Sequence, residues 1–337
     1  MFDISILIPV FNVEPYVKRC VESIVNQEFS GSYEIILVDD CSTDSSYSVL
    51  LELQAKYGQE KIKIERHSQN KKLSQARLTG FLAARGKYIW NVDSDDWIEK
   101  GALQELYNIT LKNDVDVVLF NAQYHDGQVG KTMDSSVLES RVYSEEEIAS
   151  FQPWFISSIW RKLIKRSIVN ENYELFRVSM NYEEDLIYCI ELFSNIKSLY
   201  FTPKVYYSYF HNLKSITKQI NQLHRFNNSI LVNELQVKVL RKYNNGRMSK
   251  YKEYSTKAYG LYIFRLLYLK LKLKRVSKES MAAFQEGYLN VREMLLITNN
   301  NHMFYEDDLE FRKLLKKNTH FYGSFKVFKK IIWHLIH

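Results

Sequence analysis

Two groups of neighbouring carboxylates carry the clearest chemical signal in the sequence. The apolar run Tyr88–Val92 ends directly in Asp93-Ser94-Asp95-Asp96, and an earlier run, Glu34–Val38, ends in Asp39-Asp40. At the carboxyl edge of an open α/β sheet, such side chains face the crevice in which ligands bind. Paired carboxylate oxygens suit Mg²⁺ or Mn²⁺, ions that bridge to substrate phosphates. Acidic turns also end many strands without binding anything, so the rest of the chain must decide.

Two further segments offer charged groups that suit the same edge. The stretch from Asn70 to Gly80 contains Ser74, a candidate helix cap, and Arg77 one turn later. A helix N-terminus with a guanidinium can hold a base or a diphosphate. Glu183-Glu184-Asp185 precedes the apolar positions of a predicted helix and could supply a general base. Each segment also has a structural explanation: a solvated surface arginine in the first, and helix-dipole complementarity in the second.

Composition and cysteine content indicate a globular cytoplasmic protein. The chain has 337 residues, of which 46% are apolar and 25% charged, enough for one large or two medium domains. Cys20, Cys41 and Cys189 are too few and too scattered for a disulfide framework or a zinc site. The first residues predict no signal peptide, and no apolar run approaches the roughly 18–20 residues that span a bilayer.

Basic residues gather near the end of the chain, which has a net charge of +7. Such a tail suits an anionic surface, but no nucleic-acid-binding motif accompanies it, so we expect no nucleic-acid partner. The segment Ser324–Ile336 has an apolar face. It fits a helix lying in a membrane interface, or equally one docked on its own domain or on a second subunit.

Strand and helix patterns alternate over the first 120 residues, which predicts right-handed crossovers and a mostly parallel sheet flanked by helices. We expect Asn12 to cap the first helix, and Gly86 to close the third with a positive φ. The predicted strands are Ile4–Pro9, Glu34–Val38, Ile62–Glu65, Tyr88–Val92 and Val115–Asn121, and the later helices are Tyr47–Tyr57, Ser74–Arg85 and Gly101–Lys112.

The pattern is less regular after Asn121. Asp126-Gly127 predicts a hairpin turn. Further strands are expected within Ser157–Ile164 and Ser198–Tyr209, with a helix from about Glu184 to Ser194 between them. From about Gln219 onward the pattern is helical.

The order and spacing of these motifs are specific, although each motif alone is short. They are Ile-Pro-Val-Phe-Asn (8–12), Val-Asp-Asp-Cys-Ser-Thr-Asp (38–44), Asn70…Leu73-Ser74-Gln75-Ala76-Arg77 and Asp93-Ser94-Asp95-Asp96, followed downstream by Ile159-Trp160-Arg161-Lys162-Leu163, Glu184-Asp185 and Tyr207-Ser208-Tyr209…Ser215-Ile216-Thr217. Over roughly residues 3–217 the chain resembles an inverting family 2 glycosyltransferase with the GT-A fold, a Rossmann-like sheet. Many relatives have Gly where Lys72 stands, which puts the geometry of that loop in question.

The resemblance implies a role for each motif residue. Asp185 would be the catalytic base, with Glu184 beside it, and Asp95 would hold Mn²⁺ or Mg²⁺, with His211 as a further metal or diphosphate contact. Asp40 would bind the base, and Asp39 the ribose or base edge. The full nucleotide-sugar-binding set is Pro9, Phe11, Asp39, Asp40, Asn70, Arg77, Asp93 and Ser94. Trp97, Trp154 and Trp160 are candidates for stacking on sugar rings, with core packing the alternative for each.

The implied organisation is a catalytic domain, 1–217, with a nucleotide-sugar part (1–121) and an acceptor part (122–217), followed by a helical region, 218–337. The implied partners are a nucleotide-sugar donor, most commonly a UDP-sugar, and a lipid-linked cell-surface glycan at the inner face of a bacterial plasma membrane. Alternatives are a glycan already attached to protein, or a nucleotide-sugar-binding protein without catalysis. A homo-oligomer remains open. No Gly-x-Gly-x-x-Gly follows the first strand, which argues against a dehydrogenase.

Overall fold

The computed structural model describes residues 2–125, 132–133, 138–149, 151, 158–181 and 183–212, and single residues between 232 and 243. The chain divides into two compact units, Met1–Lys250 and Tyr251–His337, and the second lies outside the described residues. The expected domain boundary after residue 217 stays a prediction. So do the hairpin turn at Asp126-Gly127 and the helix Ser324–Ile336, which both lie outside the described residues.

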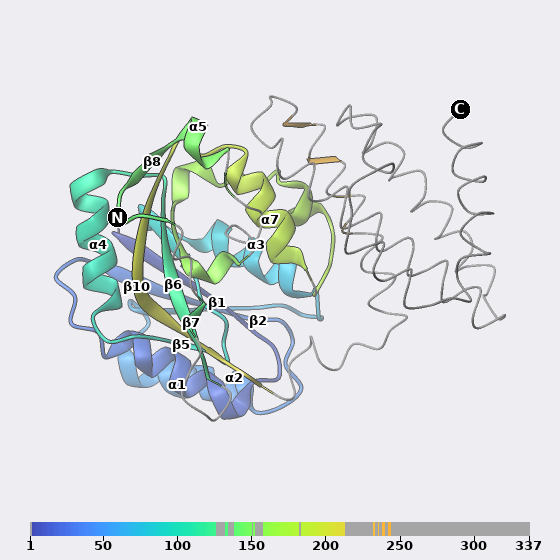
Figure 1. The fold of residues 1–337 in the computed structure, drawn as a ribbon. Coiled ribbons are helices and arrows are strands. Elements are labelled where there is room, and N and C mark those ends of the chain that lie inside the picture. The colour runs from blue at the N-terminus through green and yellow to red at the C-terminus, as the bar shows by residue number, and fades with distance from the viewer. Residues whose placement is uncertain are drawn as a thin grey trace, which may run out of the picture. The chain divides into compact units, whose positions relative to one another are not determined.

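Within the described residues one mixed sheet forms the centre of the first unit (Figure 1). The strand order is β3-β2-β1-β4-β9-β6-β10-β5, with β7 on β6 and β8 on β10. The strands are β1 (Ile4–Val10), β2 (Tyr33–Asp39), β3 (Ile62–Arg66), β4 (Tyr88–Asn91), β5 (Trp97–Ile98), β6 (Val117–His125), β7 (Thr132–Met133), β8 (Val142–Ser144), β9 (Lys162–Lys165) and β10 (Ser198–Phe210).

The first four strands are parallel, as the alternating pattern predicts. All seven positions of β1 are buried, as expected for a strand covered on two sides. In β3, which lies at the edge of the sheet, only Ile62 is buried. The second half of the sheet is mixed. β9 inserts antiparallel between β4 and β6, although it follows both in sequence. The expected mostly parallel sheet therefore holds for β1 to β4 and for the pair of β6 and β10.

Helices cover both faces of the parallel half. In Figure 1, β1 and β2 lie between α1 and α2 on one side and α3 on the other. The face of α1 formed by Val17, Cys20, Val21 and Ile24 is buried, as the three-and-four spacing predicts. The helices are α1 (Glu14–Val25), α2 (Ser46–Tyr57), α3 (Leu73–Ala83), α4 (Ala102–Asn113), α5 (Glu145–Ile148) and α7 (Glu184–Phe193), with short 3₁₀ turns η1 (Ile159–Arg161), η2 (Arg166–Ile168) and η3 (Glu174–Arg177).

Two predicted helix caps were wrong. Val13, not Asn12, occupies the N-cap of α1, and the Asn12 side chain accepts the Thr43 N–H at 2.8 Å. Ser74 lies inside α3, where its hydroxyl donates to the Val178 carbonyl at 2.6 Å. In both cases a bond to a distant segment replaced the local cap, which sequence spacing does not reveal.

The predicted positive φ at Gly86 was also wrong, since this glycine is required by close approach. The positive-φ glycines in the described residues are Gly58 and Gly101. A Cβ on Gly86 would lie 2.5 Å from the Ser5 nitrogen, so any larger residue would push β1 away. Among the described residues, none of the helices is both long and apolar enough to cross a membrane.

Candidate active site

The carboxyl ends of β1, β2 and β4 meet at one edge of the sheet because these strands are parallel neighbours. Asp39 is the last residue of β2, and Asp93 follows β4 by two positions. Pro9 is buried in β1, and Phe11 is half-buried just beyond it. Topology therefore brings the sequence-predicted carboxylates to the edge where ligands of such sheets bind.

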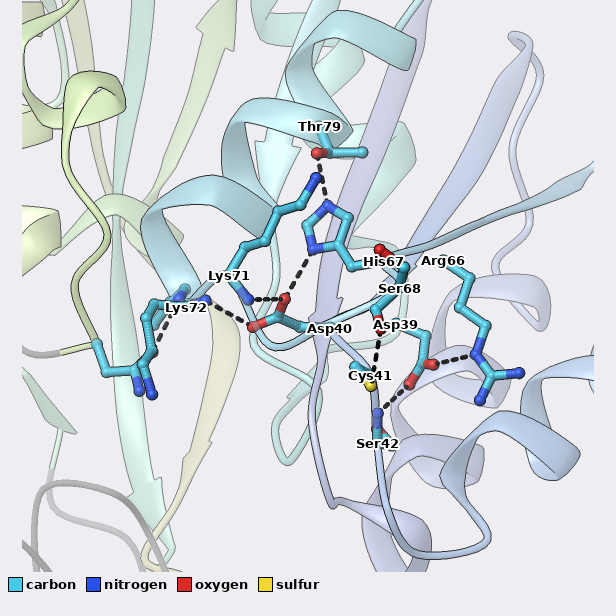
Figure 2. Close-up of polar contacts among 12 residues, drawn as sticks. Asp39, Asp40, Cys41, Ser42, Arg66, His67, Ser68, Lys71, Lys72 and Thr79 are labelled. Carbon is cyan, nitrogen blue, oxygen red and sulfur yellow. Dashed lines mark hydrogen bonds and ion pairs between the residues drawn. The ribbon is translucent and has the colours of Figure 1, made fainter.

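Asp40 is buried and holds the loop that precedes α3 (Figure 2). One oxygen, Oδ1, accepts the Lys71 N–H at 2.7 Å and lies 2.7 Å from His67 Nδ1. The other, Oδ2, accepts the Lys72 N–H at 2.8 Å. His67 Nε2 in turn lies 2.8 Å from the Thr79 hydroxyl on α3. Both oxygens are thus engaged by the protein, and Asp40 anchors this loop. Its implied contact with a nucleobase stays a prediction.

Lys72 has a backbone conformation that is normally reserved for glycine. Its φ is 76° and its ψ is 166°, in the region that residues with a Cβ almost never adopt. Asp40 fixes the Lys72 amide, and the Asn181 side chain accepts the next amide, of Leu73, at 2.8 Å. These bonds hold the strained residue in place. Its positive φ explains why a glycine suits this position.

Replacing Lys72 by glycine is expected to stabilise the fold. The strained backbone of Lys72 costs roughly 1–3 kcal/mol, a cost that glycine avoids. Glycine has more conformational freedom in the unfolded chain, which offsets part of this stabilisation. We expect Lys72→Gly to exceed Lys72→Ala in unfolding free energy by about 1 kcal/mol, measured by urea denaturation. Lys71→Gly is the matched control and should lower stability. Equal stability of the Lys72→Gly and Lys72→Ala proteins would contradict the strain.

Asp39 is fully buried, and its carboxylate faces the guanidinium of Arg66. Its Oδ1 accepts the Ser42 N–H at 3.2 Å, and its Oδ2 lies 3.1 Å from Arg66 Nε. The Arg66 guanidinium stacks over the Tyr47 ring, 3.8 Å from the ring centroid. Figure 2 shows Asp39 and Asp40 pointing in different directions, Asp39 towards Arg66 and Asp40 towards His67. Separate partners therefore relieve the repulsion between the two adjacent acids.

Arg77 joins the strand-end carboxylates to α7. It is 3% exposed, and it donates to Asp93 Oδ1 at 3.1 Å and to Glu184 Oε1. Burial alone would lower the pKa of Arg77, but Glu184, Asp93 and Asp185 raise it above its usual value. The arginine is therefore permanently charged, and it joins α3 to α7 and to the loop that follows β4. A solvated surface arginine, the alternative for this stretch, is not what the fold contains.

Asp185 lies in the first turn of α7, beside this cluster. Burial and the neighbouring Glu184 raise the pKa of its carboxyl to about 7. Among the described residues its side chain accepts one hydrogen bond, from the Leu186 N–H at 2.9 Å. Glu184, in contrast, is buried and paired with Arg77. In the cluster around Arg77, Asp185 is thus a carboxylate that can accept a proton near neutral pH.

Asp95 is the better of the strand-end carboxylates for a cation. Burial and the neighbouring Asp93 raise the pKa of Asp95 to about 6, because two carboxylates lie close together. Its Oδ2 accepts from Asn212 Nδ2 at 3.2 Å. A bound divalent cation would relieve this repulsion, so the donor set fits one. No three His, Cys, Asp or Glu side chains of the described residues converge as ligands, so water and a diphosphate would complete the shell.

Asp96 and Tyr207 hold the acidic loop against β10. The Tyr207 hydroxyl donates to Asp96 Oδ2 at 2.6 Å and accepts the Asp93 N–H at 3.0 Å. Asp96 Oδ1 accepts the Phe210 N–H at 2.7 Å. Burial and the neighbouring Asp95 raise the pKa of Asp96. Asp96 is therefore an anchor of the loop, and it belongs to the structure of the site.

The remaining candidates differ in their surroundings. Ser94 is buried in the acidic loop, and the Asn70 Oδ1 atom is buried without a hydrogen-bond partner among the described residues, as expected for a group that meets a ligand. His211 is exposed, and its backbone N–H bonds to the His125 carbonyl. Trp160 is buried and stacks on Tyr207 at 4.7 Å, which indicates core packing.

Several residues that shape the site were not assigned a role from the sequence, although the sequence contains a signal for some of them. His67 follows the third parallel strand, so its place at the common edge could have been anticipated. The same signal applies to Arg66, the last residue of that strand. Asn212 gave none, because its partner Asp95 lies 117 residues away in sequence, and the motif that contains Tyr207 did not reveal its bond to Asp96. Trp97 is half-buried, with the Arg19 guanidinium 4.1 Å from its ring centroid. Trp154 lies outside the described residues.

The chain is similar in sequence to several known proteins. The family model described as "Glycosyl transferase family 2" matches residues 5–172. The protein named "Putative glycosyltransferase EpsH" from Bacillus subtilis is 28% identical over 255 residues, which is 74% of this chain and 72% of that relative. The protein named "Poly(ribitol-phosphate) beta-N-acetylglucosaminyltransferase TarP" from Staphylococcus aureus is 28% identical over 62% of this chain and 62% of its own length.

A solved structure shares the fold. The crystal structure of S. aureus TarS 1-349 in complex with UDP-GlcNAc matches with a TM-score of 0.57 and 16% sequence identity, over 91% of this chain and 94% of that one. At this identity the match establishes the α/β architecture alone.

Proposed function

Because the chain belongs to glycosyl transferase family 2, we propose that this glycosyltransferase moves a sugar from a UDP-sugar to a hydroxyl group of a cell-surface polymer. The observation that carries the proposal is the Arg77 bridge. It holds Asp93, at the end of β4, and Glu184, next to the candidate base Asp185, in one buried cluster. This cluster supports the proposal because it joins the edge proposed to bind the donor to the proposed proton acceptor.

The identity of donor and acceptor is supported by the relatives. TarP is named for transfer of N-acetylglucosamine to poly(ribitol phosphate), and the TarS structure contains UDP-GlcNAc. We therefore propose UDP-GlcNAc or a related UDP-sugar as donor. The proposed acceptor is a hydroxyl of a teichoic-acid-like or other surface polymer, carried on a lipid and met at the inner face of the membrane. A protein-attached glycan is the alternative acceptor.

Asp185 performs the proton transfer in the proposed mechanism. Its carboxylate accepts the proton of the acceptor hydroxyl while that oxygen bonds to the anomeric carbon. The bond from the anomeric carbon to the diphosphate oxygen breaks on the opposite face, so the configuration inverts. Arg77 holds Glu184 and Asp93 in place. Tyr207 and Asp96 fix the loop that carries Asp93 and Asp95.

Asp95 would hold a Mn²⁺ or Mg²⁺ ion through its carboxylate, with Asn212 orienting one of its oxygens. When bound, the ion supplies Lewis-acid stabilisation of the charge on the departing nucleoside diphosphate. The chain's own contribution is to place this carboxylate on a loop that Tyr207 and Asp96 hold rigid, two residues after the Asp93 that Arg77 fixes.

Donor hydrolysis with Mn²⁺ tests the proposal, starting with UDP-GlcNAc and continuing through UDP-Glc, UDP-Gal, UDP-GalNAc, GDP-Man and dTDP-Rha. We expect metal-dependent release of UDP, with a fall of ~10²–10⁴ in rate for Asp95→Asn. Asp114→Asn is the matched control, because Asp114 is 65% exposed and caps α4, where it pairs with Lys87 and Lys165.

Two results would count against the proposal. Hydrolysis that is unaffected by chelation or by Asp95→Asn would remove the metal role. If no donor turns over with or without acceptor, while calorimetry detects UDP binding, the chain would be the nucleotide-sugar-binding protein that is the second candidate.

A further inference from the structure

Lys162, the first residue of β9, carries a buried charge that the proposed mechanism does not use. Its side chain is completely buried. The ammonium donates to the Ser158 carbonyl, lies beside the Cys189 thiol on α7, and is 5.7 Å from the centroid of the Phe193 ring. These contacts place a lysine Nζ directly against the inner face of α7.

This ammonium has no carboxylate within ion-pair distance in the described part of the chain. Burial lowers the pKa of Lys162 to about 8, so the group is still largely protonated at neutral pH. A buried ion without a close partner lowers stability, and replacing one by an apolar residue of similar volume is often neutral or stabilising. The stability of the fold therefore does not explain a lysine at this position.

The position of Lys162 relative to the candidate base Asp185 indicates a role in the reaction. Cys189, which Lys162 contacts, lies four residues after Asp185, so the two project from the same face of α7. Three carboxylates, Asp93, Glu184 and Asp185, surround the single guanidinium of Arg77. Arg77 therefore leaves this cluster with excess negative charge, and the charge of Asp185 favours the protonated form of the buried Lys162.

We propose that Lys162 is a positioning residue for the transfer reaction: its buried ammonium, held under α7 by Cys189 and the Ser158 carbonyl, maintains Asp185 as a carboxylate ready to accept a proton. The proposal rests on the proposed function, because it concerns the same base. The charged and titratable groups that face this pair are Arg161 and Cys189 around Lys162, and Arg77, Glu184 and Asp93 around Asp185.

The test compares Lys162→Met with Lys162→Arg and with Lys165→Met. Lys165 is the matched control, since it ends the same strand and pairs with exposed Asp114. The readout is the titration of Asp185, followed by ¹³C NMR of aspartate Cγ and assigned with Asp185→Asn. We expect Lys162→Met to move the Asp185 midpoint up by about half to one pH unit, a roughly three- to tenfold change in proton affinity. Lys162→Arg and Lys165→Met should leave it in place.

A second readout tests the charge itself. Because the pKa of Lys162 falls from its usual 10.5 to about 8 on folding, the unfolded chain binds more protons between these values, and wild-type stability rises with pH there. Lys162→Met should therefore melt at a higher temperature than wild type at pH 7, and the difference should shrink towards pH 10. A difference that does not change with pH would overturn the proposal.

The proposal and the proposed function fail in different ways. An Asp185 midpoint that coincides in wild type and Lys162→Met would overturn the role of Lys162, whatever the turnover. Absence of turnover in the wild type would contradict the proposed function, while the titration still decides whether Lys162 acts on Asp185. In an active wild type, the acid limb of kcat/KM should shift upward in Lys162→Met and return with Lys162→Arg.

Discussion

Replacing Asp185 by asparagine is expected to lower the rate of sugar transfer by ~10²–10⁴ while nucleotide binding persists. An amide of the same shape cannot accept the proton of the acceptor hydroxyl. The substitution breaks no ion pair, because Glu184 and not Asp185 bonds to Arg77, and the Asp185 side chain accepts only the Leu186 N–H among the described residues. The loss should therefore fall on kcat.

The pH dependence gives this prediction a second measurement. Because the pKa of Asp185 is raised to about 7, its base form is lost as the pH falls through that value. Wild-type kcat/KM should rise with pH up to about 7 and then level off, and the residual activity of Asp185→Asn should lack this limb. An asparagine variant with wild-type turnover would exclude Asp185 as the base.

Glu184→Gln is the informative comparison, because Glu184 is the second candidate catalytic residue. Its carboxylate is paired with Arg77 in a buried contact, so the amide should lower stability more than Asp185→Asn does. We expect a smaller loss of kcat and an unchanged acid limb. The reverse order of the two kcat values would assign the base role to Glu184.

Replacing Arg77 by methionine is expected to lower the free energy of unfolding by roughly 3–5 kcal/mol, the second large effect. The guanidinium is 3% exposed and donates to carboxylates from two different segments, Asp93 and Glu184. Its removal leaves those carboxylates, with Asp185 nearby, without the cation that pairs them. Urea denaturation followed by circular dichroism measures the loss, and activity should fall below detection.

We expect Arg77→Lys not to recover the stability that Arg77→Met loses, because a single ammonium cannot form the two directed bonds that the planar guanidinium makes. Arg141→Met is the control, since Arg141 is 43% exposed and its pair with Glu147 lies at the surface. Adding Glu184→Gln to Arg77→Met should recover part of the lost stability, which a double-mutant cycle would measure. A stability of Arg77→Met equal to that of the control would show that the cluster does not hold α7 to the sheet.

The sequence predicted the parallel half of the sheet well, because there the information is local. The runs that became β1 to β4 are short and separated by periodic helices, and β1, β2 and β4 are buried on both faces. Since parallel neighbours end at the same edge, the strand-end position of Asp39 and Asp93 followed directly. The acidic run Glu183-Glu184-Asp185 was also recognised as a possible source of a general base, but no local pattern shows its proximity to Asp93.

What the sequence could not reveal are contacts between distant segments. Tyr207 reaches back 114 residues to the Asp93 amide, and Ser74 bonds to a carbonyl 104 residues later. Both side chains have ordinary local uses, a core aromatic and a helix cap, which spacing alone favours. The insertion of β9 between β4 and β6 is also a contact between distant segments. The sequence of a short apolar strand does not show which strands it pairs with.

The place of β9 has a consequence for how the chain is made. As the protein emerges from the ribosome, β1 to β4 can pair with one another at once, because every partner precedes Val92. The other side of β4 has to wait for Lys162–Lys165. Until then the nascent chain presents an unpaired strand that contains Ile89 and Trp90, the type of edge on which chains aggregate or chaperones bind. A pause in translation after β4 should therefore expose this edge, and one after β9 should not.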